Sequence, residues 1–139
     1  MSESEKVLEV ARALSHALDH NDFTSAARWI ASDCVYLVRG EEIIGASAIL
    51  TSYADNAAWA TEHFDEVRYE SEVSLGNDGS AAVLYTDYLM KVPGQWHRHR
   101  CRQHLTLGPN GHVVHIRHED LPGETESLEA YFKVCGIER

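Results

Sequence analysis

The chain has 139 residues, with 22 acidic residues against 12 lysines and arginines, and therefore a formal net charge of −10 at pH 7. So acidic a protein is poorly suited to nucleic acid, because phosphate binding needs a basic surface. No apolar run is long enough to span a bilayer, and the acidic first residues contain no apolar signal segment. We expect a single domain over residues 1–139 that binds neither nucleic acid nor a membrane.

The three cysteines, Cys34, Cys101 and Cys135, are odd in number and widely spaced. They form no paired zinc-ligand motif, and isolated cysteines of this kind are typical of a reducing compartment. The sequence therefore favours a cytoplasmic protein without disulfides, and we expect it to need no cofactor.

The first half of the chain has mainly helical periodicity. Apolar residues recur on one side of a helix over residues 4–20, and Asp22 is placed to cap a second, short helix that runs through Ile30. β-branched and aromatic residues predict a short strand over residues 34–38. A turn over residues 39–42 follows, and then a third helix over residues 46–63.

The second half changes to the two-residue period of strands. Strands are predicted over residues 65–75, 81–92, 96–107 and 113–120, and a short helix over residues 127–134. Turn residues separate the strands at Gly76–Gly79, Pro93–Gly94 and Gly108–Gly111.

The last hairpin, residues 96–120, holds six of the nine histidines. Alternation places Leu105, Leu107, Val114 and Ile116 on one face, which we interpret as the core face. The same face becomes polar toward one end, and this gradient predicts a pocket with a dry floor and a functional mouth. The polar positions are His97, His99, Gln103, His118 and Asp120.

The order of helix, helix, strand, helix and four long strands resembles the nuclear transport factor 2-like superfamily, in its SnoaL-like and ketosteroid isomerase-like branch. The resemblance covers nearly the whole chain. It implies an α+β fold in which a curved antiparallel sheet and three principal helices form a cone around a pocket. It also implies a homodimer. The matching segments are Leu18–Phe23, Ala31–Tyr36, Ile44–Ile49, Leu105–Leu107 and Val113–Ile116.

The isomerase chemistry of that branch is not implied, because its catalytic positions are changed. The tyrosine of the first helix, the aspartate base of the first strand and the acid of the penultimate strand correspond here to Leu14, Val38 and Gln103. Two apolar residues cannot move a proton, so steroid isomerisation by that mechanism is not expected. Fold alone does not assign function in such a superfamily.

His99, His118 and Asp87 are the candidate catalytic residues, because alternation places all three on the pocket face. A carboxylate beside an imidazole can orient it and raise its pKa, which suits a general acid and base. Scytalone dehydratase, which has the same fold, is similar in using pocket histidines with tyrosines and an aspartate. The candidate ligand-binding residues are Tyr36, Val38, Tyr53, Trp59, Tyr85, Cys101, Gln103, Ile116 and Asp120.

Two functions remain open at this point. One is a cofactor-independent lyase or isomerase that acts on a small, mostly apolar molecule, with Asp87 orienting the two histidines. The other is a carrier or sensor that binds such a molecule without turnover, in which the polar groups satisfy one another inside a wet cavity.

Two further readings of the pocket residues are weaker. His97, His99 and His118 with Asp120 invite a metal site, but they supply few ligands and we expect none. Cys101 would be a nucleophile only if a neighbour deprotonated it, and a buried cysteine that fills space is more common.

The opposite face of the last strands predicts an interface. It mixes aromatic, methionine and arginine side chains, which are enriched where proteins meet. We expect a homodimer through this face, with the arginines meeting Glu66, Glu70 or Glu72 of the partner. The residues concerned are Thr86, Tyr88, Met90, Arg98, Arg100 and Arg102.

Overall fold

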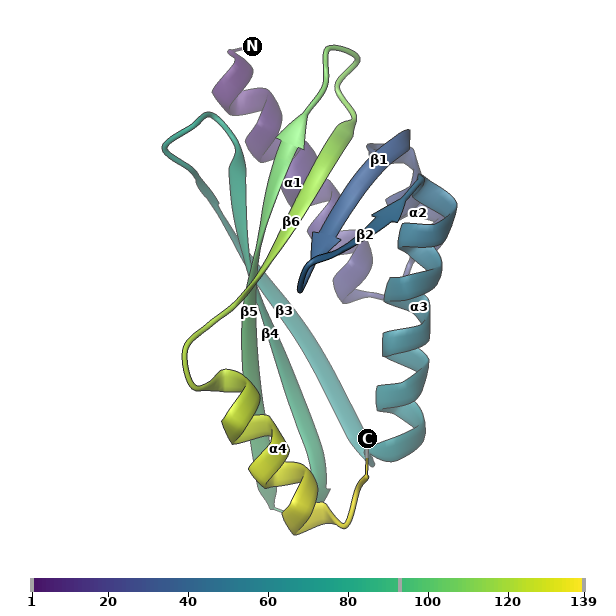
Figure 1. Ribbon diagram of the computed structural model, residues 1–139, viewed down its shortest axis with the longest axis vertical. Helices are drawn as coiled ribbons and strands as arrows, with labels where there is room; N and C mark the ends of the chain where they lie inside the picture. The colour runs from purple at the N-terminus through teal and green to yellow at the C-terminus, as the bar shows by residue number, and fades with distance from the viewer. Residues whose placement is uncertain (1, 93, 139) are drawn as a thin grey trace.

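The computed structural model describes residues 2–92 and 94–138, so Pro93 of the predicted Pro93–Gly94 turn lies outside the described residues. The fold is α+β (Figure 1). Its elements are α1 (Glu3–Asp19), α2 (Phe23–Ala26), the single 3-10 turn η1 (Ala27–Trp29), β1 (Ile30–Val38), β2 (Glu41–Ile44), α3 (Ala46–His63), β3 (Glu66–Leu75), β4 (Ala81–Val92), β5 (Gln95–Leu107), β6 (Val113–Asp120) and α4 (Glu124–Cys135).

The sheet has six strands in the order β2-β1-β6-β5-β4-β3 and curls around one side. The helix α1 packs against β3 and β4, α3 against β1, and α4 against β5. In Figure 1, α3 stands beside the long strands and α4 lies at their far end. The predicted cone of one curved sheet and three principal helices is therefore confirmed.

The expectation that the sheet is wholly antiparallel needs a correction, since β1 and β6 pair in parallel, with Tyr36 opposite Ile116. Five elements separate these strands in the chain. No short turn dictates their relative direction, and only their packing side by side in the curled sheet sets it.

The segment after the first strand was wrongly predicted as a turn of four residues. Arg39 and Gly40 both have positive φ, 48° and 80°, as a two-residue hairpin turn requires. The chain therefore folds back at once, and β2 pairs with β1 from Val38–Glu41 to Val35–Ile44. The strand β1 also begins earlier than predicted, at Ile30, because the second helix ends after η1.

The predicted core face of the last strand is wrong at one position. Thr106 pairs with His115, but the next pair is Leu107 with Val113, so Val114 is an extra residue on β6. Such a bulge reverses the alternation. Val113, and not Val114, is therefore fully buried with Ile116.

The strand register places inward-facing side chains in rows that cross the sheet. The innermost row is apolar, and polarity increases row by row toward the other end, as the predicted gradient requires. The rows are Ala81–Leu105–Ile116, then Val83–Gln103–His118, then Ser71–Tyr85–Cys101–Asp120, and then Tyr69–Asp87–His99.

Candidate functional site

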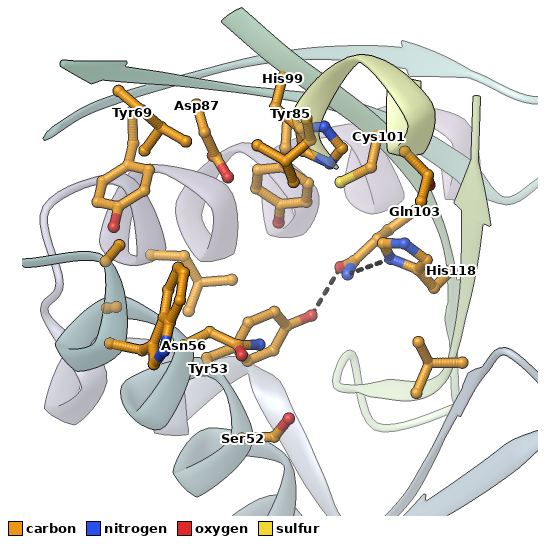
Figure 2. Close-up of a pocket in the computed structure, with 18 of the residues that line it drawn as sticks. Ser52, Tyr53, Asn56, Tyr69, Tyr85, Asp87, His99, Cys101, Gln103 and His118 are labelled. Carbon is orange, nitrogen blue, oxygen red and sulfur yellow. Dashed lines mark hydrogen bonds between the residues drawn. The ribbon is translucent and has the colours of Figure 1, made fainter. Parts of the chain in front are cut away.

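A cavity of about 1130 Å³ lies between the polar rows of the sheet and α3, with the end of α1 and the helix α4 completing its wall. Figure 2 shows side chains from the strands and from α3 projecting into it from opposite sides. Ten of the twelve residues predicted for the site line this cavity: Tyr36, Val38, Tyr53, Trp59, Tyr85, Asp87, His99, Cys101, Gln103 and His118.

The other two predicted residues do not line it. Ile116 has no exposed surface and belongs to the core below the cavity. The Asp120 carboxylate is turned to the rim, where both oxygens accept hydrogen bonds from Arg39 at 2.8 Å. Alternation predicts the correct face of β6 for both residues, but it cannot say how far along that face the cavity extends.

Asp87 is the most perturbed acidic group of the cavity. Burial, with the charge of Asp19 as a second cause, raises the pKa of Asp87 to about 7. Its carboxyl group makes no hydrogen bond within the described residues, and Figure 2 shows it pointing into the cavity between Tyr69 and Tyr85. Both the protonated and the ionised form of this carboxyl group are therefore populated near neutral pH.

His99 is the pairing partner of Asp87 on the adjacent strand. Burial lowers the pKa of His99 and outweighs the nearby Glu124 and Asp120 carboxylates, which act to raise it. The Nδ1 atom of His99 and the hydroxyl of Tyr85 are both buried and have no hydrogen-bond partner among the described residues.

In the row Asp87–His99 the pKa of the aspartate therefore lies above that of the histidine, which is the reverse of their usual order. In water an aspartate is ionised while a histidine begins to protonate, because their pKa values are about 3.9 and 6.5. Here burial moves both groups toward their neutral forms. A neutral carboxylic acid and a neutral imidazole on one cavity wall can act as proton donor and proton acceptor.

His118 has different partners from those predicted. Asp87 does not orient it. The His118 ring contacts the Asp120 carboxylate through Nε2 at 2.8 Å and the Gln103 amide through Nδ1 at 3.3 Å. Burial opposes ionisation of Asp120, but hydrogen bonds from Arg39 and His118 lower its pKa.

Gln103 joins this rim group to two tyrosines. Its Oε1 accepts a hydrogen bond from the Tyr53 hydroxyl at 2.6 Å, and its Nε2 donates one to the Tyr36 hydroxyl at 3.0 Å. Gln103 is nearly fully buried. Figure 2 shows the connection from Tyr53 through Gln103 to His118.

The structure also bears on the hypotheses of a cysteine nucleophile and of a metal site, and on the position of Trp59. Burial raises the pKa of the Cys101 thiol to about 12, which disfavours a nucleophilic thiolate. Trp59 lines the cavity and also packs against Phe64 and Phe132 at its far end. Within residues 2–92 and 94–138, no three His, Cys, Asp or Glu side chains are grouped so that they could hold a metal ion.

The lining residues that were not predicted from the sequence include Asp19, Arg39 and Tyr69. Tyr69 was detectable, since it alternates with apolar residues on the inward face of β3. Asp19 ends α1 and accepts a hydrogen bond from Ser71 at 2.6 Å, and Arg39 lies in a turn. No local pattern of the sequence places these two beside β4 and β6.

Comparison with known proteins identifies the fold. No protein-family model and no curated protein matches the sequence. An LEH-like epoxide hydrolase of M. tuberculosis superposes with a TM-score of 0.67 at 18% identity, covering 97% of this chain and 99% of that one. The chain has the nuclear transport factor 2-like fold.

Two further solved structures share the nuclear transport factor 2-like fold with this chain. Bal32a, from a soil-derived mobile gene cassette, has a TM-score of 0.68 at 16% identity and covers 85% of this chain and 91% of its own. A polyketide cyclase-like protein of Xanthomonas campestris has a TM-score of 0.64 at 14% identity, covering 95% and 98%. Identities this low establish the fold and leave the activity to the site. None of the helices in the described ranges combines the length and apolarity needed to span a membrane.

Proposed function

We propose that this protein is a cofactor-independent lyase or isomerase that acts by acid and base catalysis on a small, mostly apolar, oxygenated molecule. The observation that carries the proposal is the pair Asp87 and His99, on adjacent strands of one cavity wall, with burial favouring the neutral form of each. Perturbed titratable groups of this kind cluster at reaction sites, and two groups whose environments move their pKa values apart can divide the roles of acid and base.

In the proposed reaction the Nδ1 atom of His99 removes a proton from a carbon next to an oxygen-bearing carbon. The electron pair of that C–H bond forms a carbon–carbon double bond. For a ketone, the carbonyl oxygen takes the proton of Asp87 and an enol results, which returns to a ketone when carbon is reprotonated elsewhere. For an alcohol, the C–O bond breaks and the hydroxyl leaves as water with the Asp87 proton.

The surroundings support this assignment of roles. The Tyr85 hydroxyl is buried beside Asp87 with no partner among the described residues, and it can donate a hydrogen bond to the same substrate oxygen. Buried donors need no reorganisation as charge develops on that oxygen. Solved proteins with this fold include a polyketide cyclase-like protein and an LEH-like epoxide hydrolase, so the fold accommodates oxygenated small molecules in those cases.

A carrier or sensor is the second candidate, and one observation favours it. The other polar wall of the cavity, from Tyr53 through Gln103 to His118 and Asp120, already has hydrogen-bond partners within the protein. Such a wall serves recognition without chemistry. The two functions differ in whether bound molecules are changed.

The experiment is an incubation of the protein in D₂O with a panel of cyclic ketones, hydroxyketones, enones and epoxides. Mass spectrometry follows deuterium incorporation and loss or gain of water, and thermal shift follows binding. If the protein is an enzyme, turnover should be lost in His99→Gln. It should be retained in the control His112→Gln, which changes an exposed histidine of a turn. Binding of panel members without any turnover would favour the carrier.

We also propose that the protein forms a homodimer through the outer face of the sheet. On that face the Nε atom of Arg100 is buried without a partner among the described residues. Trp96 is 41% exposed, with the Arg68 guanidinium 5.0 Å from its ring centre. Light scattering at micromolar concentration tests the dimer, and a purely monomeric mass would contradict it.

A cytoplasmic location is proposed as well. It is supported by Cys34, Cys101 and Cys135, which are all free thiols. Fractionation of the native host is the direct test.

A further inference from the structure

A series of hydrogen bonds runs from Arg39 through Asp120 and His118 to Gln103. The chemistry of each group determines which partner donates and which accepts. A guanidinium can only donate, so the two oxygens of Asp120 accept from Arg39. The Asp120 carboxylate can only accept, so Nε2 of His118 donates to it at 2.8 Å. In a neutral imidazole the other nitrogen is then an acceptor, and Nδ1 of His118 faces the Gln103 amide at 3.3 Å.

The Gln103 amide continues this direction to the two tyrosines. Its NH₂ group must face the accepting Nδ1 of His118, and the second hydrogen of that group reaches the Tyr36 hydroxyl at 3.0 Å. Its carbonyl oxygen therefore faces Tyr53, whose hydroxyl donates to it at 2.6 Å.

The two tyrosines are left with opposite capacities toward the cavity that both of them line. Tyr36 accepts from Gln103, so its own hydroxyl hydrogen is available, and it has no acceptor among the described residues. Tyr53 has used its hydrogen, so its oxygen lone pairs are available. Their rings stack with centroids 5.6 Å apart, and both hydroxyls contact the same amide.

We propose that Tyr36, Tyr53 and Gln103 form a recognition site for a ligand hydroxyl group, that of an alcohol, a phenol or an enol. The ligand oxygen accepts from Tyr36, and the ligand hydrogen is donated to Tyr53. An ether or a ketone meets only the first requirement, and it leaves the Tyr53 oxygen without a donor. Sites built to bond a hydroxyl discriminate strongly against analogues that lack it.

Gln103 is the residue that determines this specificity. If His118 took the opposite tautomer, the amide would turn over, Tyr53 would become the donor and Tyr36 the acceptor. One donor and one acceptor would still face the ligand. The rim group of Arg39, Asp120 and His118 determines only which tyrosine donates to the ligand and which accepts from it. These three residues are therefore positioning residues.

The inference deepens the proposed function, since it names a chemical feature of the ligand, but it rests only on binding in the cavity. Its tests therefore use binding and the ligand-free protein, with no measurement of turnover. A failure here would leave the acid and base roles of Asp87 and His99 intact, and an absence of turnover would leave this site intact.

The binding test compares 2-naphthol with 2-methoxynaphthalene, which differ by the hydroxyl hydrogen. By isothermal titration, 2-naphthol is expected to bind the wild-type protein about tenfold more tightly, a difference of one buried hydrogen bond. Equal affinities, tighter binding of the ether, or no binding of either probe would overturn the proposal.

Two single substitutions assign the directions. Tyr53→Phe should make the two probes bind equally, because only 2-naphthol uses the Tyr53 oxygen. Tyr36→Phe should weaken both probes alike and keep their ratio, because both accept from Tyr36. Tyr88→Phe, which changes a tyrosine on the outer face of the sheet and away from the cavity, is the matched control and should change neither the ratio nor the affinities. The reversed result for Tyr36→Phe and Tyr53→Phe would overturn the assigned directions.

A measurement on the ligand-free protein is independent of the probes. In ¹⁵N spectra at neutral pH, His118 is expected to show a protonated Nε2 and an unprotonated Nδ1. Asp120→Asn should shift the ring toward the other tautomer, since an amide can donate to Nε2. A wild-type His118 protonated at Nδ1 would overturn the assignment of Tyr36 as donor.

Discussion

The cavity has two polar walls, and they differ in how their hydrogen-bonding groups are satisfied. On the Asp87 wall, Asp87, His99 and Tyr85 each keep a polar group without a partner in the described chain. On the Gln103 wall, each group from Tyr53 to Arg39 contacts the next at 3.3 Å or less. The two walls share the strand β5, on which His99 and Gln103 lie only two rows apart.

This difference separates chemistry from positioning. A polar group that is buried without a partner costs free energy, and such groups persist where a ligand supplies the missing contact. Groups that are hydrogen-bonded to one another in a network are held in place, so their remaining donors and acceptors point in one direction. We infer that the Asp87 wall carries the reaction and the Gln103 wall holds the ligand.

The largest expected effect is on turnover. In any reaction found with the D₂O panel, Asp87→Asn should slow the rate by about 10²- to 10⁴-fold, as expected when a general acid is removed. His118→Gln, on the bonded wall, should slow it by roughly tenfold or less. Initial rates measured by mass spectrometry test this prediction. Equal losses of rate in the two variants would contradict the assignment of the reaction to the Asp87 wall.

The second effect is a pH dependence of stability that Asp87 imposes. Its folded pKa of about 7 exceeds that of an unfolded aspartate, so the folded state binds the proton more tightly. The resulting stabilisation is present at low pH and is lost as pH rises toward the folded pKa. Between pH 4 and 8 the wild type should lose about 3–4 kcal/mol relative to Asp87→Asn. Urea denaturation at several pH values measures the difference, and parallel profiles would contradict the raised pKa.

The third effect concerns the stability of the bonded wall. Gln103→Leu should lower the free energy of unfolding by about 2 kcal/mol, because it strands polar atoms of His118, Tyr36 and Tyr53. Gln95→Leu is the matched control, as an exposed glutamine at the start of the same strand. Its effect should stay within about 0.5 kcal/mol. Urea midpoints compare the two, and a smaller loss in Gln103→Leu than in the control would show that the wall is not a stabilising network.

The smallest effect is expected at the rim. The Arg39 side chain is 63% exposed, and surface ion pairs contribute little in water. Arg39→Ala should therefore change stability by less than about 1 kcal/mol, in spite of its two hydrogen bonds to Asp120. Thermal unfolding in low and high salt measures it, and a larger loss would mean that the bonded wall depends on its exposed end.

Alternation along long strands made part of the site predictable. Asp87 and His99 lie on regular stretches of β4 and β5, where the period of two continues without interruption. Their shared face therefore follows from the residues alone. The same argument failed for Val114, because the bulge in β6 shifts the period there. The position of β2 was not predictable because the two-residue turn contains Arg39, which rarely adopts positive φ.

The sequence by itself determined the order of the elements other than β2, the inward faces of the regular strand segments and the dry-to-polar gradient, because these depend on local periodicity. Only the tertiary structure decided the partners of the functional groups. Arg39 meets Asp120 across 81 positions, and Tyr53 meets Gln103 across 50. Burial is also a tertiary property. It raises the pKa of Asp87 and lowers that of His99, although both are ordinary titratable residues in the sequence. Local patterns therefore identify which residues face the cavity. The curl of the sheet determines their hydrogen-bond partners and their pKa values.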